Sequence, residues 1–209
     1  MKVFFTSDLH FGHENVLRFD NRPFETVAEM DEELMKRWNA KVDKGDLVYI
    51  LGDMIWRVST NEAPVLLRKL NGQKILIKGN HDRFIKNAAA KKELAAVKDY
   101  DDICVKLEDG TQRRCILSHY FMPFYIGHRY SAIHLHGHSH NTEESLEEEH
   151  ITAYLRAKGY NLEVYNVGCM YWNYEPVTLD EILQKEGYKY VESAEIGQDV
   201  ILDARDKMS

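Results

Sequence analysis

The chain has 209 residues, is 44% hydrophobic and carries a formal net charge of −7 at pH 7, which suits one globular domain expected over residues 1–209. The acidic balance argues against long nucleic acids as partners, because proteins hold them through a broad basic surface. No apolar run is long enough to cross a bilayer, and the opening MKVFFTSDLH reaches a charge too early for a secretory signal, so we expect a soluble cytoplasmic protein with no membrane partner.

The first half of the chain predicts alternating strands and helices. In chain order, the expected elements are strand 2–6, helix 26–42, strand 47–51, helix 63–70, strand 74–77 and helix 84–98. The strands are short apolar runs, whereas the helices show apolar residues at helical spacing, as at Met30, Leu34 and Trp38. Because β-α-β units form parallel strands, the loops after these strands should meet at one edge of a sheet.

The second half of the chain changes to a hairpin pattern. Strands 103–107 and 113–117 flank the turn signal Asp109-Gly110, and further short strands are expected over 132–135 and 162–167. Parallel units followed by hairpins predict an α/β fold with two packed sheets rather than one open sheet.

Two later segments have a distinct composition. The acidic segment 142–150, TEESLEEEH, predicts a solvated helix face or a mobile loop. Residues 178–185 and the mixed stretch after them predict a covering helix and an edge strand or tail. The aromatic and aliphatic content of the second half leaves room for a homodimer.

The three cysteines, Cys104, Cys115 and Cys169, are an odd number without metal-type spacing, which favours reduced thiols over a disulfide framework. One alternative stays open. If Asp109-Gly110 forms a two-residue turn, Cys104 falls directly opposite Cys115 on the paired strands, and a redox link would be allowed.

Polar residues with metal-binding chemistry follow the apolar runs. They are Asp8, His10, Asp53, Asn80, His119, His138 and His140. Carboxylate, imidazole and amide ligands without thiolates suit two divalent cations, Mn²⁺ first, with Fe, Zn, Ni or Mg as alternatives. Two ions about 3.5–4 Å apart can share a bridging hydroxide that attacks phosphorus in an in-line displacement. Phosphoester hydrolysis is the reaction that this set serves best.

The ordered motifs Asp8-x-His10, Gly52-Asp53, Gly79-Asn80-His81-Asp82, Ser118-His119 and Gly137-His138-Ser139-His140 resemble the calcineurin-like metallophosphoesterase superfamily. The match spans residues 8–140, and the run 6–24 is similar to small bacterial and phage members. The resemblance implies a four-layer α/β/β/α sandwich of two mixed β-sheets flanked by helices. It also implies that Asp8, His10 and His140 bind the first metal, that Asn80, His119 and His138 bind the second, and that Asp53 bridges them.

The resemblance makes His81 the group that contacts phosphate and protonates the leaving oxygen, a role that suits an imidazole because its pKa lies near neutrality. The alternative is a histidine that only orients a metal ligand. Asp82 is expected either to orient His81 or to cap the next helix.

Other residues near the motifs have weaker assignments. Arg22 is the expected contact to a substrate phosphate, ahead of Arg57 and Arg129. Surplus histidines are not counted as ligands: His13 is expected to support a ligand, and His134 and His136 to line the cavity floor. Aromatic residues around the motifs either stack a nucleobase or aryl ester, or simply pack; they are Phe11, Trp56, Tyr120, Phe121, Phe124, Tyr125, Tyr171 and Trp172.

These observations predict a two-metal phosphoesterase acting on a small, nucleotide-like phosphoester, with a diester favoured over a monoester. The alternatives are a non-catalytic scaffold of the same fold that binds a partner protein, and a nuclease. A scaffold would tolerate a missing ligand, whereas every ligand is present here, and the acidic balance weakens the nuclease.

Overall fold

The structure is a computed structural model that describes residues 1–56 and 62–185. Its larger sheet has five strands in the order β4-β3-β2-β1-β9. These strands are β1 (Val3–Thr6), β2 (Leu47–Ile50), β3 (Gln73–Ile77), β4 (Ala96–Lys98) and β9 (Val177–Thr178). The first four are parallel to one another, and β9 pairs with β1 in the antiparallel sense.

The smaller sheet has four strands in the order β5-β6-β7-β8. Its strands are β5 (Asp101–Lys106), β6 (Gln112–Leu117), β7 (Ile133–His136) and β8 (Glu163–Asn166). The β5–β6 pair is an antiparallel hairpin, whereas β7 is parallel to both β6 and β8. Both sheets are therefore mixed, as the family resemblance implies.

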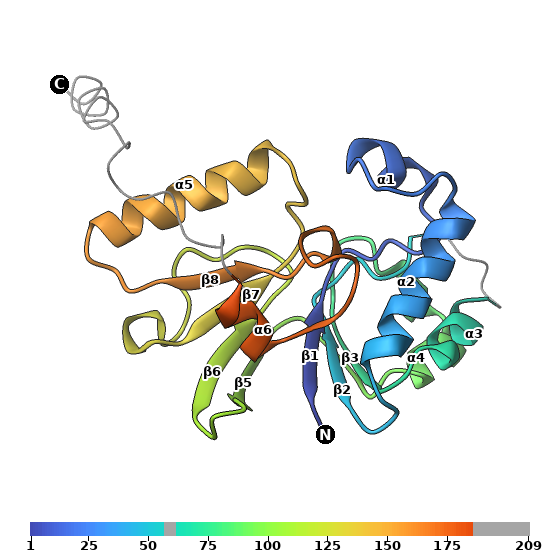
Figure 1. The fold of residues 1–209 in the computed structure, drawn as a ribbon, viewed down its shortest axis with the longest axis horizontal. Coiled ribbons are helices and arrows are strands. Elements are labelled where there is room, and N and C mark those ends of the chain that lie inside the picture. Colours follow the sequence, from blue (N-terminus) through green and yellow to red (C-terminus); the bar gives the residue numbers. More distant parts are fainter. Residues whose placement is uncertain (57–61, 186–209) are drawn as a thin grey trace.

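Helices cover the outer faces of the two sheets (Figure 1). The α-helices are α1 (Glu14–Phe19), α2 (Val27–Lys41), α3 (Glu62–Lys69), α4 (Ala88–Lys92), α5 (Glu143–Ala157) and α6 (Leu179–Gln184). Three short 3₁₀ turns are η1 (Arg83–Lys86), η2 (His128–Tyr130) and η3 (Cys169–Tyr171). Helix α2 begins where the Thr26 side chain accepts a hydrogen bond from the Glu29 N–H, and its buried face carries Met30, Leu34 and Trp38.

Three apolar clusters fill the spaces between the layers. Along β1, Phe4 packs with the α2 side chains and Phe5 packs between the two sheets, as expected for alternate residues of a strand. A third cluster joins Leu155 of α5 to Ile116 and Val164 of the smaller sheet. The order is helix, sheet, sheet, helix, which confirms the predicted four-layer sandwich. No helix within residues 1–56 and 62–185 has the length and apolar character needed to span a membrane.

The predicted helix over 84–98 is wrong. This stretch forms η1, the short helix α4 and the edge strand β4. Asn87 begins α4 by accepting hydrogen bonds from the backbone N–H groups of Ala89 and Ala90. Residues 96–98 then pair with β3, with Ala96 opposite Ile75. Sheet pairing therefore overrides the helical propensity of this alanine- and lysine-rich stretch.

The two-residue turn that would place Cys104 opposite Cys115 does not form, and the hairpin register differs from that alternative by one residue. The Leu107 N–H donates to the Thr111 carbonyl, so the turn holds three residues between them instead of two. Cys115 consequently lies opposite Ile103, and Cys104 lies opposite Arg114. Paired residues face the same side of the hairpin, and neighbouring residues of one strand face opposite sides. Cys104 therefore shares the exposed face with Arg114, whereas Cys115 lies on the buried face, and the three thiols are free.

The acidic segment is helical, as one of the two predictions had it. Residues 143–150 form the first half of α5, and Ser145 is the buried member of that half. Helix α6 begins at Thr178 with a capping box to Glu181, which confirms the expected helix over 178–185. The edge strand or tail expected after it lies in 186–209, outside the described residues.

Candidate metal centre

The seven predicted ligands all lie just beyond the carboxyl ends of strands. Asp8 and His10 follow β1, Asp53 follows β2, Asn80 follows β3, His119 follows β6, and His138 and His140 follow β7. The loops are joined by backbone hydrogen bonds, from Asp8 N–H to Gly52 O and from His10 N–H to Asp53 O, both 3.0 Å. Parallel strands of both sheets thus deliver these side chains to one place.

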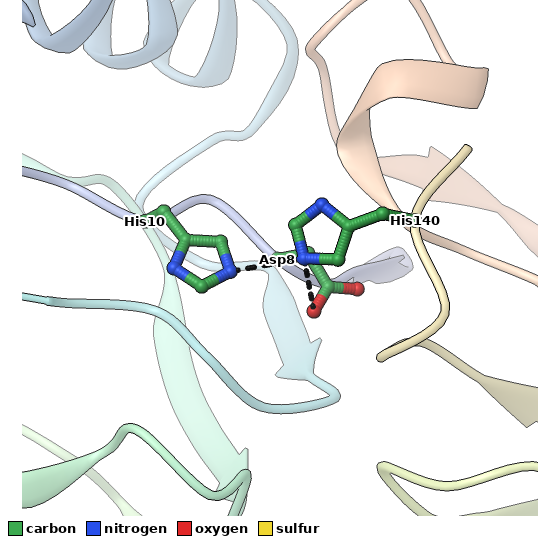
Figure 2. Close-up of side chains that lie close together, drawn as sticks. All are labelled: Asp8, His10 and His140. Carbon is green, nitrogen blue, oxygen red and sulfur yellow. Dashed lines mark hydrogen bonds and ion pairs between the residues drawn. The ribbon is translucent and has the colours of Figure 1, made fainter. Parts of the chain in front are cut away.

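The first cluster contains Asp8, His10 and His140, three buried residues whose ligand atoms lie within 4.8 Å of one another (Figure 2). The Nε2 atoms of His10 and His140 are 3.1 Å apart, and His140 Nε2 lies 3.7 Å from Asp8 Oδ1. Asp8 and His10 come from the larger sheet and His140 from the smaller one, so this cluster spans the junction between the sheets.

The second cluster contains Asp53, His119 and His138, and Asn80 joins it. His119 Nε2 is 3.0 Å from Asn80 Oδ1 and 3.2 Å from His138 Nδ1. The His119 Nδ1 lies 2.8 Å from the Leu51 carbonyl, which fixes this nitrogen as the donor and leaves Nε2 as a free ligand atom. These four side chains also come from both sheets.

Asp53 lies between the clusters. Its Oδ2 atom is 3.8 Å from His10 Nε2 and 3.7 Å from His119 Nε2, while its Oδ1 accepts a hydrogen bond from the His81 N–H at 2.9 Å. Burial raises the pKa of Asp53, and nearby cations would favour its ionised form. This position would allow one carboxylate to contact an ion at each cluster.

The donor atoms fit divalent cations. Burial and the neighbouring His140 hold the pKa of His10 well below its usual range, so its imidazole is neutral. The Nε2 atoms of His10 and His140 are 3.1 Å apart, and two imidazole nitrogens at this distance need a proton or a cation between them, because two facing lone pairs would repel. Asp8 Oδ1 is buried and accepts no hydrogen bond within the described ranges. A cation would satisfy all of these atoms, and hard or borderline ions suit this set of ligands.

Five of the ligands have a left-handed backbone, which is uncommon outside glycine. The φ angles are +57° at Asp8, +53° at His10, +52° at Asp53, +75° at His138 and +48° at His140. Each such residue costs about 1–3 kcal/mol and persists only where the surroundings impose it. Concentration of this strain at the ligands indicates a site built for binding rather than for stability.

Two glycines allow the loops to approach closely. A Cβ atom on Gly52, where φ is +94°, would lie 2.2 Å from His119 Nδ1. A Cβ atom on Gly137 would lie 2.5 Å from Asp8 Oδ2, which accepts a hydrogen bond from the His138 N–H. The glycines of the Gly-Asp and Gly-His-Ser-His motifs are therefore required by the packing of loop against loop.

His81 lies beside the metal centre and is partly exposed. Its Nε2 lies 3.9 Å from Asp53 Oδ2, and its side chain is 33% exposed. The ring packs against Trp56 at a centroid distance of 4.1 Å, and Trp56 stacks on His13 at 4.0 Å. His81 is thus positioned next to both clusters and remains accessible to a substrate.

Asp82 takes neither of the two expected roles. Its carboxylate accepts hydrogen bonds from the backbone N–H groups of Asp53, Met54 and Gly79, at 2.8–2.9 Å, and makes no capping bond to η1. Burial raises the pKa of Asp82 to about 6. Asp82 therefore ties the loop after β2 to the loop after β3, and it acts on the backbone of the ligands rather than on the His81 ring.

The Arg22 side chain is fully enclosed by the protein. Its Nε donates to Asp20 Oδ2 at 2.9 Å, and its terminal nitrogens donate to the carbonyls of Leu9 and Asp8. This placement argues against the expected contact with a substrate phosphate. Arg129 lies over the Tyr160 ring, and Arg57 lies outside the described residues.

Asp20 is a residue that the sequence reasoning missed. Its Oδ2 atom lies 3.3 Å from His140 Nδ1. Burial opposes ionisation of Asp20, but the contacts with His140 and Arg22 outweigh it and lower the pKa of this carboxyl. The signal available in the sequence was the opposite charge of Asp20 and Arg22, two residues apart in the first loop.

The surplus histidines are structural in different ways. His134 is buried, with Nδ1 3.1 Å from the Ile116 carbonyl and Nε2 accepting from the Met122 N–H. Its pKa falls to about 4 and that of His136 to about 3, chiefly because both are buried. They pack against Tyr125 and Phe121 respectively, and the expectation that they line the cavity floor stays a prediction.

The aromatic residues divide into packing and exposed groups. Phe11, Tyr125 and Trp172 are buried. Tyr120 is 50% exposed, lies 4.4 Å from the His138 ring, and its hydroxyl donates to Asn80 Oδ1 at 3.3 Å. Phe19, which the sequence reasoning did not single out, is 54% exposed and meets the His140 ring edge-on at 5.8 Å.

Comparisons with known proteins identify the family and the fold. A family model described as calcineurin-like phosphoesterase matches residues 1–193. An uncharacterized protein of Methanocaldococcus jannaschii is 45% identical over 84 residues, 40% of this chain and 48% of that protein, so the match spans about half of the relative. The gene 66 protein of Mycobacterium phage D29 is 34% identical over 161 residues, 66% of this chain and 78% of the phage protein.

A solved structure shares the fold. It is a protein of unknown function from Aquifex aeolicus, with a TM-score of 0.63 and 24% identity, and the match covers 88% of this chain and 98% of that one.

Proposed function

The chain belongs to the calcineurin-like phosphoesterase family, and from this membership we propose that it hydrolyses a small phosphodiester at the two clusters, with His81 assisting the leaving group. Metal-dependent hydrolysis of phosphoesters is what the family implies. The observation that carries the proposal is the position of Asp53 Oδ2, 3.8 Å from a histidine of the first cluster and 3.7 Å from a histidine of the second.

Asp8, His10 and His140 would hold one ion, Asn80, His119 and His138 the other, and Asp53 both. When bound, two divalent ions supply Lewis acidity and a nucleophile drawn from water at neutral pH. Mn²⁺ is the ion we expect first, because oxygen and imidazole ligands suit it and no thiolate takes part.

His81 is the residue that donates the proton to the departing alcohol. It is partly exposed, its Nε2 lies on the side of Asp53, and Trp56 restricts the ring by packing against it. An imidazole can hold and release a proton near neutral pH, and general acids of this kind contribute about 10²–10⁴ in rate. Asp82 supports the step indirectly, since its carboxylate accepts hydrogen bonds from the N–H groups of Asp53 and Gly79 and so holds their two loops together.

The exposed aromatic rings support a substrate with a flat group, such as a nucleotide. Tyr120 stands beside His138, and Phe19 stands beside His140, so each cluster has one exposed ring at its edge. Stacking of a base on an aromatic side chain contributes about 1–3 kcal/mol. The second ester group of a diester would extend toward one of these rings. A cytoplasmic location fits such a substrate and stays a prediction.

The test uses metal-stripped protein with Mn²⁺, Ni²⁺, Zn²⁺ or Mg²⁺ added back, on a bis-aryl phosphate and an aryl monophosphate. We expect His81→Ala to keep both metals and lose about 10²–10⁴ in kcat. Asp53→Asn should lose metal binding together with activity, because the shared carboxylate is gone.

His150→Ala is the matched control, since the His150 side chain is 66% exposed on α5. It should behave like the parent. If Asp53→Asn and His81→Ala hydrolyse both esters as fast as the parent, the roles proposed for these two residues are refuted. A parent protein that hydrolyses neither ester with any of the four ions would instead favour the scaffold.

A further inference from the structure

The buried pair of Asp20 and Arg22 has no role in the mechanism above, yet it touches the first cluster from both sides. The side chains of both residues are 0% exposed, and Arg22 Nε lies 2.9 Å from Asp20 Oδ2. A buried ion pair adds little net stability, because desolvation of the two charges offsets their attraction. Its position therefore needs another explanation.

On one side the pair holds the loop after β1. The Arg22 guanidinium donates to the Asp8 carbonyl at 2.7 Å and to the Leu9 carbonyl at 2.9 Å. These carbonyls flank the main chain that carries Asp8 and His10, both of which have a left-handed backbone. The hydrogen bonds to Arg22 are contacts that oppose relaxation of this loop.

On the other side the pair reaches His140. Asp20 Oδ2 lies 3.3 Å from His140 Nδ1, at ion-pair distance but without good hydrogen-bond alignment. The other carboxylate oxygen of Asp20, Oδ1, is buried and accepts no hydrogen bond from the part of the chain that the structure describes. The carboxylate thus has acceptor capacity left for the imidazole, whose Nε2 faces Asp8 and His10.

We propose that Asp20 is a positioning residue for the first metal ion, which keeps the proton of His140 on Nδ1 and so leaves Nε2 free to bind. This inference rests on the proposed metal centre. Arg22 balances the charge of Asp20 and links the orientation of His140 to the loop of Asp8 and His10. A single buried ion pair then fixes the positions of the three side chains that would bind one ion.

The first measurement is the tautomer of His140 in the metal-free parent protein, read from imidazole ¹⁵N shifts by NMR at mildly alkaline pH. We expect protonated Nδ1 and unprotonated Nε2. The opposite tautomer would overturn the inference, and this result does not depend on a variant that folds.

The second measurement is calorimetric titration of the metal-stripped protein with Mn²⁺. Asp20→Asn should weaken one of the two binding events by about 10–100-fold and leave the other near the parent value. Asp46→Asn is the control, because Asp46 is also buried but accepts hydrogen bonds from the N–H groups of Lys2 and Asp43. It should leave both events unchanged.

If Asp20→Asn binds both ions like the parent, or weakens both equally, Asp20 does not position His140 and the inference fails. A parent protein that binds two ions but hydrolyses neither test ester would instead refute the proposed function and leave this inference standing. The two failures are therefore distinguishable.

Discussion

Substitution of Gly52 by alanine tests whether the close approach of the loops is needed for folding. Gly52 has a φ of +94°, and an added Cβ would lie 2.2 Å from His119 Nδ1 and 2.8 Å from the Gly79 Cα. Gly110 in the β5–β6 turn has a nearly equal φ of +89°, yet an added Cβ would meet nothing within 4 Å. The two positions share the backbone strain and differ in the steric clash.

The expected losses follow from these two terms. Alanine in the left-handed region costs about 1–2 kcal/mol, which is the whole expected effect for Gly110→Ala. Gly52→Ala adds an overpacking term of about 1–3 kcal/mol, because one contact is with a backbone atom that cannot rotate away. We therefore expect Gly52→Ala to lower the free energy of unfolding by about 2–5 kcal/mol in total.

The assay is urea unfolding of metal-free protein, followed by circular dichroism, with both variants compared with the parent at the same m value. Metal-free conditions keep the stability of the fold separate from metal binding. If Gly52→Ala is no less stable than Gly110→Ala, the loops have room that the structure does not show, and the steric argument is refuted.

Two further predictions concern buried titratable groups. Burial raises the pKa of Glu148 from 4.5 to about 7, so the folded state holds a proton that the unfolded state releases. The free energy of unfolding of the metal-free parent should therefore fall by on the order of 2–3 kcal/mol as the pH rises from 4.5 to about 7. Glu148→Gln should reduce this fall, measured by urea unfolding at several pH values. A variant whose stability falls with pH as steeply as that of the parent would contradict the assignment. Burial also raises the pKa of Cys115 and Cys169 to about 12, whereas Cys104 is exposed, so iodoacetamide should label Cys104 alone until the protein is unfolded. Mass spectrometry that finds all three thiols labelled at one rate in the native protein would refute this.

The strands and the seven ligands could be predicted because their signals are local and repeated. Each ligand follows a short apolar run, and the ends of parallel strands meet for reasons of topology alone. The left-handed backbone at five of these residues could not be predicted, since aspartate and histidine, although enriched at positive φ, adopt it at only a minority of positions.

The failures share a different cause. The register of the hairpin and the strand at 96–98 depend on a partner strand that the local pattern does not specify. The contacts of Asp82 and Arg22 depend on which way a polar side chain turns once it is buried. A motif shows that such a residue is near the ligands, but only packing decides whether it faces a substrate or the backbone behind them.

Each cluster takes side chains from both sheets, and this bears on how the protein comes to hold its ions. A growing polypeptide that has not yet reached His138 and His140 has no complete set of donors, however well its first strands are formed. If the proposed centre binds two ions, they would bind only after the two sheets have met, and they would stabilise the folded protein rather than start its folding.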